Sequence, residues 1–218
     1  MPKKLIAAQL CVFMVLSGCA QFKRPPLMIK VPEFYDNKTK INELTLVADP
    51  YMESLKAKHF FSADLPKKGF LPVHFIAFNF GDQAYDLSET RFTLLRDDGA
   101  EIEPMNPKDV SRRVLHHTSL RMLGWGFAGL VILSIPFSMV AGIDSFRANQ
   151  EVRRAVKENT LRVFEVGPHE AVDGFFFFEL ARGSRRIREA LGHQYALVIH
   201  NLKEKETANT YEFRIGLN

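Results

Sequence analysis

The chain has 218 residues, of which 46% are hydrophobic and 25% are charged, a balance typical of a globular protein. This composition excludes intrinsic disorder and a protein with many membrane spans, and the length suits a single domain. The 29 basic residues slightly exceed the 25 acidic ones, but they are interleaved with acids, so we expect no nucleic-acid partner.

Residues 1–18 have the features of a secretory signal. Two lysines precede the apolar stretch 5–16, which suits a signal peptide and is too short to span a bilayer. The sequence LSGC at 16–19 then resembles the lipobox of bacterial lipoproteins. This resemblance implies cleavage between Gly18 and Cys19, and acylation of the Cys19 thiol and new amino group, with palmitate among the acyl chains. The alternative is an ordinary signal or anchor helix in which Cys19 is incidental.

Lipidation at Cys19 would determine both the chemistry and the location of the mature chain. Cys11 would leave with the signal peptide, so the mature protein would have no disulfide and no thiol chemistry. Two or three acyl chains, at about 0.8 kcal/mol for each buried methylene, would hold the protein at a membrane. The resemblance implies a periplasm-facing protein of the cell envelope. Ala20 follows the cysteine where inner-membrane lipoproteins of enterobacterial type have aspartate, which favours the outer membrane.

Residues 19–33 are predicted to be a tether between the lipid and the domain. Pro25, Pro26 and Pro32 exclude a helix here and favour extended chain. A first edge strand over residues 27–31 is an equally good interpretation.

Residues 34–218 are predicted to form a mainly β domain, an antiparallel immunoglobulin-like β-sandwich whose core holds most of the 19 phenylalanines. The run 69–81 is apolar on both faces, as in a central strand. The Asp98-Gly99 pair is a two-residue hairpin signal between two short strands. Further strands are predicted over residues 43–49, 160–166, 175–180, 195–202 and 210–217.

An apolar, helical insertion over about 112–158 is predicted to interrupt this domain. Residues 122–143 carry no charge and are long enough to cross a bilayer, but four glycines and a proline lower helix propensity. A single crossing would place strands of one domain on opposite sides of the membrane. We therefore expect a segment that dips into the membrane and returns, a helical hairpin, or packing against a partner or a second copy. A buried insertion that shields the domain's own core is the alternative. The expected contact residues are Trp125, Phe127, Leu130, Ile132 and Phe137.

Two charged stretches follow the apolar segment. Residues 144–159 are predicted to be a helix with Arg147/Glu151 and Arg154/Glu158 as i,i+4 pairs. The later stretch 181–191 is predicted to be a loop entering a short helix. Its arginines are candidates for contact with lipid phosphates or an acidic partner: Arg182, Arg185, Arg186 and Arg188.

No motif predicts catalysis, a metal or a cofactor. The adjacent histidines His116 and His117 would point apart on a strand or a helix, which makes them a poor joint metal site. We therefore expect a non-enzymatic envelope lipoprotein that acts as a scaffold or assembly subunit. It would contact the membrane through Cys19 and residues 122–143, and a protein partner or a second copy of itself. The alternative is a periplasmic binding module for a lipid or another apolar ligand.

Overall fold

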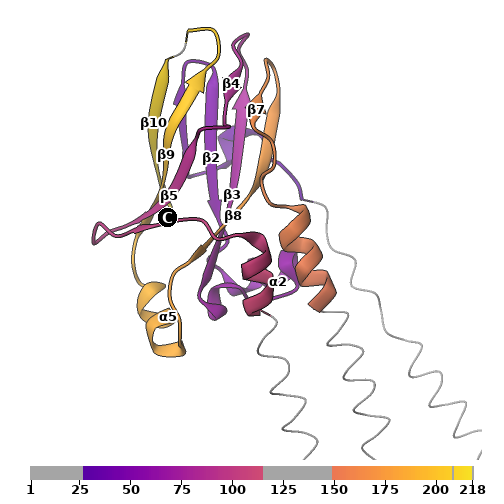
Figure 1. Cartoon of the computed structure of the whole chain (residues 1–218), viewed down its shortest axis with the longest axis vertical. Helices are drawn as coiled ribbons and strands as arrows, with labels where there is room; N and C mark the ends of the chain where they lie inside the picture. The colour runs from indigo at the N-terminus through magenta and orange to yellow at the C-terminus, as the bar shows by residue number, and fades with distance from the viewer. Residues whose placement is uncertain (1–26, 115–148, 208, 218) are drawn as a thin grey trace, which may run out of the picture.

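The computed structural model describes residues 27–114, 149–207 and 209–217, which form two antiparallel β-sheets with helices gathered at one end (Figure 1). The first sheet has the order β1-β2-β3-β8, and the second has the order β6-β5-β9-β4-β7, with β10 also paired to β9. The mainly β prediction is confirmed. The strands are β1 (Lys38–Ile41), β2 (Leu44–Pro50), β3 (Phe70–Asn79), β4 (Tyr85–Asp86), β5 (Arg91–Arg96), β6 (Glu101–Ile102), β7 (Glu165–Val166), β8 (Ala171–Glu179), β9 (Tyr195–Glu204) and β10 (Thr210–Leu217).

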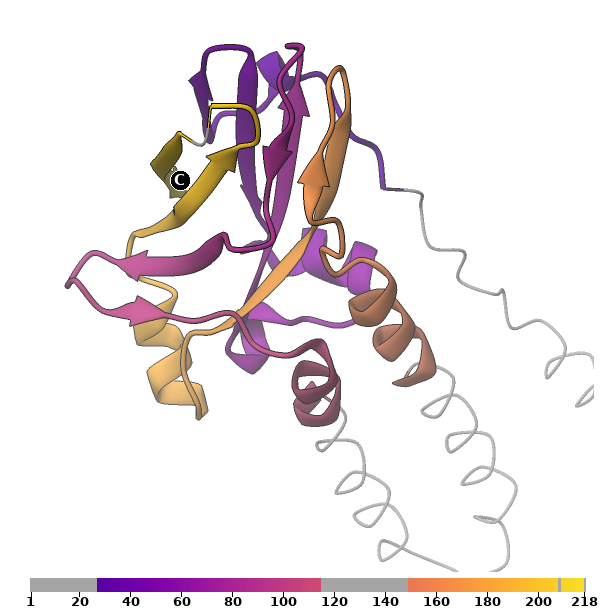
Figure 2. The same ribbon diagram turned by 45° about the horizontal axis from the view of Figure 1, so that its top comes forward.

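The helices gather mainly at the end of the sheets opposite the turn between β9 and β10 (Figures 1 and 2). Two of them lie directly on either side of segment 115–148, which is outside the described residues. These are helix 107–114 and helix 149–158. The others are η1 (Pro32–Phe34), α2 (Ser54–Phe61), η2 (Pro66–Lys68) and α5 (Ser184–Ala190).

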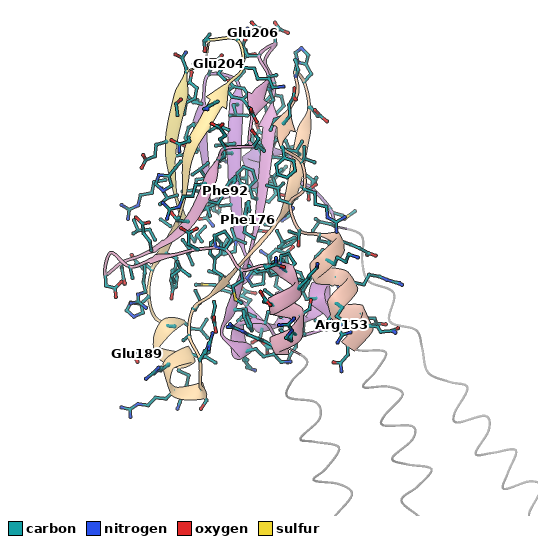
Figure 3. The ribbon with its side chains drawn as sticks, in the orientation of Figure 1. Phe92, Arg153, Phe176, Glu189, Glu204 and Glu206 are labelled. Carbon is teal, nitrogen blue, oxygen red and sulfur yellow. The ribbon has the colours of Figure 1, made fainter. Side chains whose placement is uncertain are left out.

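The main hydrophobic cluster draws side chains from both sheets. Alternate residues of β3, such as Leu71 and Phe75, meet residues of the second sheet such as Leu94 and Leu197, all of them fully buried. The Phe92 ring of β5 lies 4.3 Å from the Phe176 ring of β8, measured between centroids (Figure 3). These contacts join the two sheets around one core.

The four consecutive phenylalanines of β8 divide between two clusters because neighbouring strand residues point to opposite faces. Phe176 and Phe178 belong to the main cluster, whereas Phe175 and Phe177 face outward. The outward pair is covered by α2, helix 107–114 and helix 149–158, so both faces of this strand are apolar and buried. This second cluster consists of Tyr51, Ala57, Phe60, Phe61, Leu65, Phe70, Val110, Val114, Val152, Ala155, Val156, Phe175 and Phe177.

Several strand predictions are confirmed. The run 69–81 forms β3, which lies between β2 and β8 and is buried at every position. The Asp98-Gly99 pair joins β5 to β6, and Gly99 has the positive φ of 86° that the turn requires. The strands predicted over 43–49, 175–180, 195–202 and 210–217 correspond to β2, β8, β9 and β10.

Other predictions differ from the structure. The alternative edge strand over residues 27–31 is wrong, because this stretch carries no strand and the Lys30 N–H donates to the Tyr35 hydroxyl at 3.1 Å. Of the predicted strand 160–166, only β7 forms, with an isolated bridge between Thr160 and Phe175. The helical part of the insertion begins at residue 107, earlier than the predicted 112, because Asn106 caps it and Pro107 occupies its first turn.

Candidate membrane-facing surface

Helix 107–114 and helix 149–158 lie side by side at the helical end of the molecule (Figure 2). The Asn106 side chain accepts from the Lys108 N–H at 2.9 Å and begins the first helix. Val110 and Val114 form its buried stripe, and Val152 and Val156 form that of the second helix. Each helix is thus held on the outer face of the first sheet by an apolar i,i+4 pair.

A groove of about 570 Å³ lies between these two helices and carries a concentration of positive charge. None of the described residues that line it carries a carboxylate; its other described lining residues are Asn106, Pro107, Ser111 and Thr160. We call it the basic groove, defined by its five exposed cationic residues, Lys108, Arg112, Arg153, Lys157 and Arg162.

Few of these cations have a counter-charge among the residues that the structure describes. Arg112 lies 3.5 Å from the Asp109 carboxylate on its own helix, and the Arg162 guanidinium donates to the Lys157 carbonyl oxygen. Across the described ranges, no ion pair is found for the side chains of Lys108, Arg153 or Lys157. The groove therefore holds a net positive charge that is open to solvent.

A second groove, of about 690 Å³, lies on the other side of helix 107–114 and is centred on Glu179 of β8. The Glu179 carboxylate accepts from the Arg182 Nε at 2.6 Å and forms an ion pair with Arg113. The hydrogen bond from Arg182 is the largest cause that lowers the pKa of Glu179, and Arg113 adds to it. Lys68 donates to the Val114 carbonyl oxygen at 2.8 Å, which ties η2 to the same helix.

Replacing Glu179 with glutamine is expected to loosen the attachment of helix 107–114 while leaving the sheets intact. The folded protein lowers the pKa of Glu179, so the ionised carboxylate stabilises it at neutral pH, and this contribution is lost as the pH falls through that pKa. The ion pairs are partly exposed, so the loss in the free energy of unfolding should be below about 1 kcal/mol. Urea unfolding should show a difference at neutral pH that disappears in acid. A difference of equal size at both pH values would contradict the ionic explanation.

The arginines predicted for anionic contact lie beside this second groove. Arg182 is engaged with Glu179, whereas Arg185, Arg186 and Arg188 are exposed on α5. The prediction of a loop that enters a short helix is confirmed for this stretch.

The residues predicted for the insertion itself are only partly described. The predicted helix is present over 149–158, and its Arg154–Glu158 pair is found at 3.6 Å. The remaining predicted site residues lie outside the described residues: Gly18, Cys19, His116, His117, Trp125, Phe127, Leu130, Ile132, Phe137 and Arg147.

Sequence reasoning missed the basic groove. Lys108 and Arg112 on one helix, and Arg153 and Lys157 on the other, are each like charges at i,i+4 spacing. That repeated spacing was visible in the sequence, but nothing in it indicated that helices about forty residues apart would face each other.

A buried histidine is the other polar feature that the sequence did not indicate. His74 of β3 is 2% exposed, its Nε2 lies 2.7 Å from the Asp173 carboxylate of β8, and its ring stacks on Phe175. The pair joins the central strand β3 to β8, the last strand of the first sheet. Within residues 27–114, 149–207 and 209–217, no group of three or more His, Cys, Asp or Glu side chains could hold a metal ion.

The same described residues contain no helix of sufficient length and apolarity to traverse a membrane.

Comparisons with known proteins leave the family open. No protein-family model matches the chain, and no curated protein matches it. One solved structure that does match is that of a conserved hypothetical protein from Bacillus anthracis, with 9% sequence identity and a TM-score of 0.33 over 82% of this chain and 91% of the other. A likeness at that level supports no argument about fold or function.

Proposed function

We propose that this protein is a non-enzymatic lipoprotein of the bacterial cell envelope that acts as a scaffold or assembly subunit. Acylated Cys19 holds it at the membrane, the outer one rather than the inner one, and the helical end of the domain faces the bilayer. The lipobox-like sequence at 16–19 supports the anchor, and the basic groove supports the orientation because the bilayer surface carries anionic headgroups.

The observation that carries this proposal is the position of the two helices that flank segment 115–148. Both lie at one end of the same domain, and they pack in the same hydrophobic cluster. The strands before and after the segment share sheets, since β5 and β7 belong to one sheet and β3 pairs with β8. A single passage through a bilayer would separate these strands, which supports our proposal that the chain leaves and returns on one side of the membrane.

We extend the proposal to the finer fold, an immunoglobulin-like sandwich. Two antiparallel sheets that share one core, with a hairpin between β5 and β6 and another between β9 and β10, support it. The helices 107–114 and 149–158 shield the outer face of the first sheet.

The packing of the phenylalanines gives no support to an apolar ligand cavity. Phe60, Phe61 and Phe175 lie with ring centroids 4.9 to 5.2 Å apart, and each is at most 5% exposed. Side chains that would line such a cavity contact one another instead. A scaffold is therefore better supported than a carrier of lipid.

Replacing residues 122–143 with a Gly-Ser sequence of the same length tests the scaffold function. We expect the domain to fold, because the flanking helices are held by their own buried valines. Complexes recovered by mild crosslinking in cells should be reduced at least about tenfold, since their apolar contact surface is gone. The matched control is an equally long replacement in which the apolar residues are shuffled. Unchanged crosslinked complexes in the Gly-Ser variant would contradict the proposed contact role.

A further inference from the structure

We propose that the basic groove binds the phosphate of an anionic phospholipid headgroup, an inference that rests on the proposed attachment of the protein to a membrane. The groove brings together cations from two helices that the apolar segment separates in sequence. The headgroups at a membrane surface present phosphate diesters, which are anions that such cations can bind.

The arrangement of the cations argues for an external anion. Lys108 and Arg112 are four residues apart on one helix, as are Arg153 and Lys157 on the other, and all four line the groove. Like charges at this spacing destabilise a helix, whereas opposite charges stabilise it. The two pairs also repel each other across the groove. An anion bound between the helices would remove both sources of repulsion.

Among the described residues, the acids nearby neutralise only part of this charge. Asp109 pairs with Arg112 along the helix, and Glu158 lies 3.6 Å from Arg154, which does not line the groove. Four of the five groove cations thus have no ion pair among the described residues, and of these four Arg162 donates to a carbonyl oxygen. An ion pair with a phosphate would be charge-assisted and, for arginine, can be bidentate.

The position of the groove favours a lipid over a soluble anion. Its walls are the two helices on either side of segment 115–148, which contains the uncharged run 122–143. Arg112 and Arg153 each lie ten residues from an end of that run, so contact of the run with hydrocarbon would place the groove on the membrane-facing side of the domain. Basic residues next to an apolar membrane segment gain affinity for anionic lipid with each lysine or arginine. A volume of about 570 Å³ can admit a glycerophosphate group.

The test is a titration of the purified mature lipoprotein in uncharged detergent micelles with dihexanoyl phosphatidylglycerol, measured by calorimetry. The double variant Arg153→Gln/Lys157→Gln should bind it on the order of thirtyfold more weakly, because two of the groove charges are lost. Its thermal unfolding midpoint without lipid should be equal to or above that of the wild type, because a like-charge pair is removed. The matched control is Lys40→Gln/Arg214→Gln, which removes two exposed cations from β1 and β10 and should bind as the wild type does.

Four outcomes would overturn the proposal. They are unchanged binding in the groove variant, equal affinity for dihexanoyl phosphatidylcholine, equal affinity for inorganic phosphate, and equal affinity for a short poly-glutamate peptide. The third would assign the groove to free phosphate and the fourth to an acidic protein segment. Because the purified proteins differ only at the substituted cations, the difference in affinity between them reports on the groove. Failure of the envelope function would appear instead in the crosslinking and acylation experiments, which are carried out in cells.

Discussion

Replacing Cys19 with alanine is expected to abolish acyl labelling of the protein. The sulfur of Cys19 is the attachment point that the lipobox-like sequence implies, and the only other cysteine, Cys11, lies within the predicted signal peptide. Cells grown with an alkyne analogue of palmitate should label the wild type and leave the variant unlabelled. The variant should also migrate more slowly on a gel, because residues 1–18 are retained when the cleavage site is lost.

Cys11→Ala is the matched control for this experiment. It removes a thiol of the same signal region and should leave labelling, gel mobility and membrane fractionation as they are in the wild type. Labelling that persists in the Cys19 variant would contradict lipidation at this position. Loss of labelling in the Cys11 variant would show that the acyl chain is attached to Cys11 and that our proposal names the wrong cysteine. The anchor holds because each buried methylene contributes about 0.8 kcal/mol and two or more chains are attached.

Replacing Gly174 with alanine is expected to destabilise the described domain strongly. Gly174 lies in β8, where the chain at Leu161 crosses it closely. A Cβ at this position would lie 2.3 Å from the Leu161 Cα and 2.5 Å from its backbone nitrogen. Backbone atoms cannot give way as the end of a flexible side chain can, so we expect a loss of about 3 kcal/mol or more. That is a large share of the total stability of a domain.

Gly216→Ala in β10 is the control for this substitution. A Cβ there would have no atom within 4 Å, and the residue is exposed. Its free energy of unfolding should stay within about 0.5 kcal/mol of the wild type. Urea unfolding followed by circular dichroism compares the three proteins. If the Gly174 variant is as stable as the Gly216 variant, the crossing of β8 by Leu161 is not as close as we describe.

Features that depend on neighbouring residues were predictable from the sequence. The run 69–81 is apolar at both alternations, and only a strand buried on both faces satisfies it, as β3 does. The Asp98-Gly99 pair places a positive-φ residue where a tight hairpin needs one. The Ser184–Ala190 helix likewise follows from local sequence.

Features that depend on distant residues were not predictable. Helix α2 was missed because it is only eight residues long. Its apolar residues Ala57, Phe60 and Phe61 have the i,i+3,i+4 spacing of a helix face, but the Phe175 ring that they cover lies more than a hundred residues later. The strand β1 is short and half-exposed, so it shows no apolar alternation, and its pairing with β2 defines it. The basic groove belongs to the same class, because its two walls meet through tertiary packing.

The pairing of β8 with β3 has a consequence for how the protein is made. The register runs from Phe70 opposite Glu179 to Phe78 opposite Ala171, so the two strands are about a hundred residues apart in sequence. Pairings of such high sequence separation form slowly. In a chain exported from its N-terminus, β3 emerges well before β8, together with the apolar run 122–143. Unpaired strand edges and exposed apolar chain promote aggregation. The interval between the emergence of β3 and that of β8 is therefore the stage of biogenesis at which a chaperone that covers the edge of β3 would matter most.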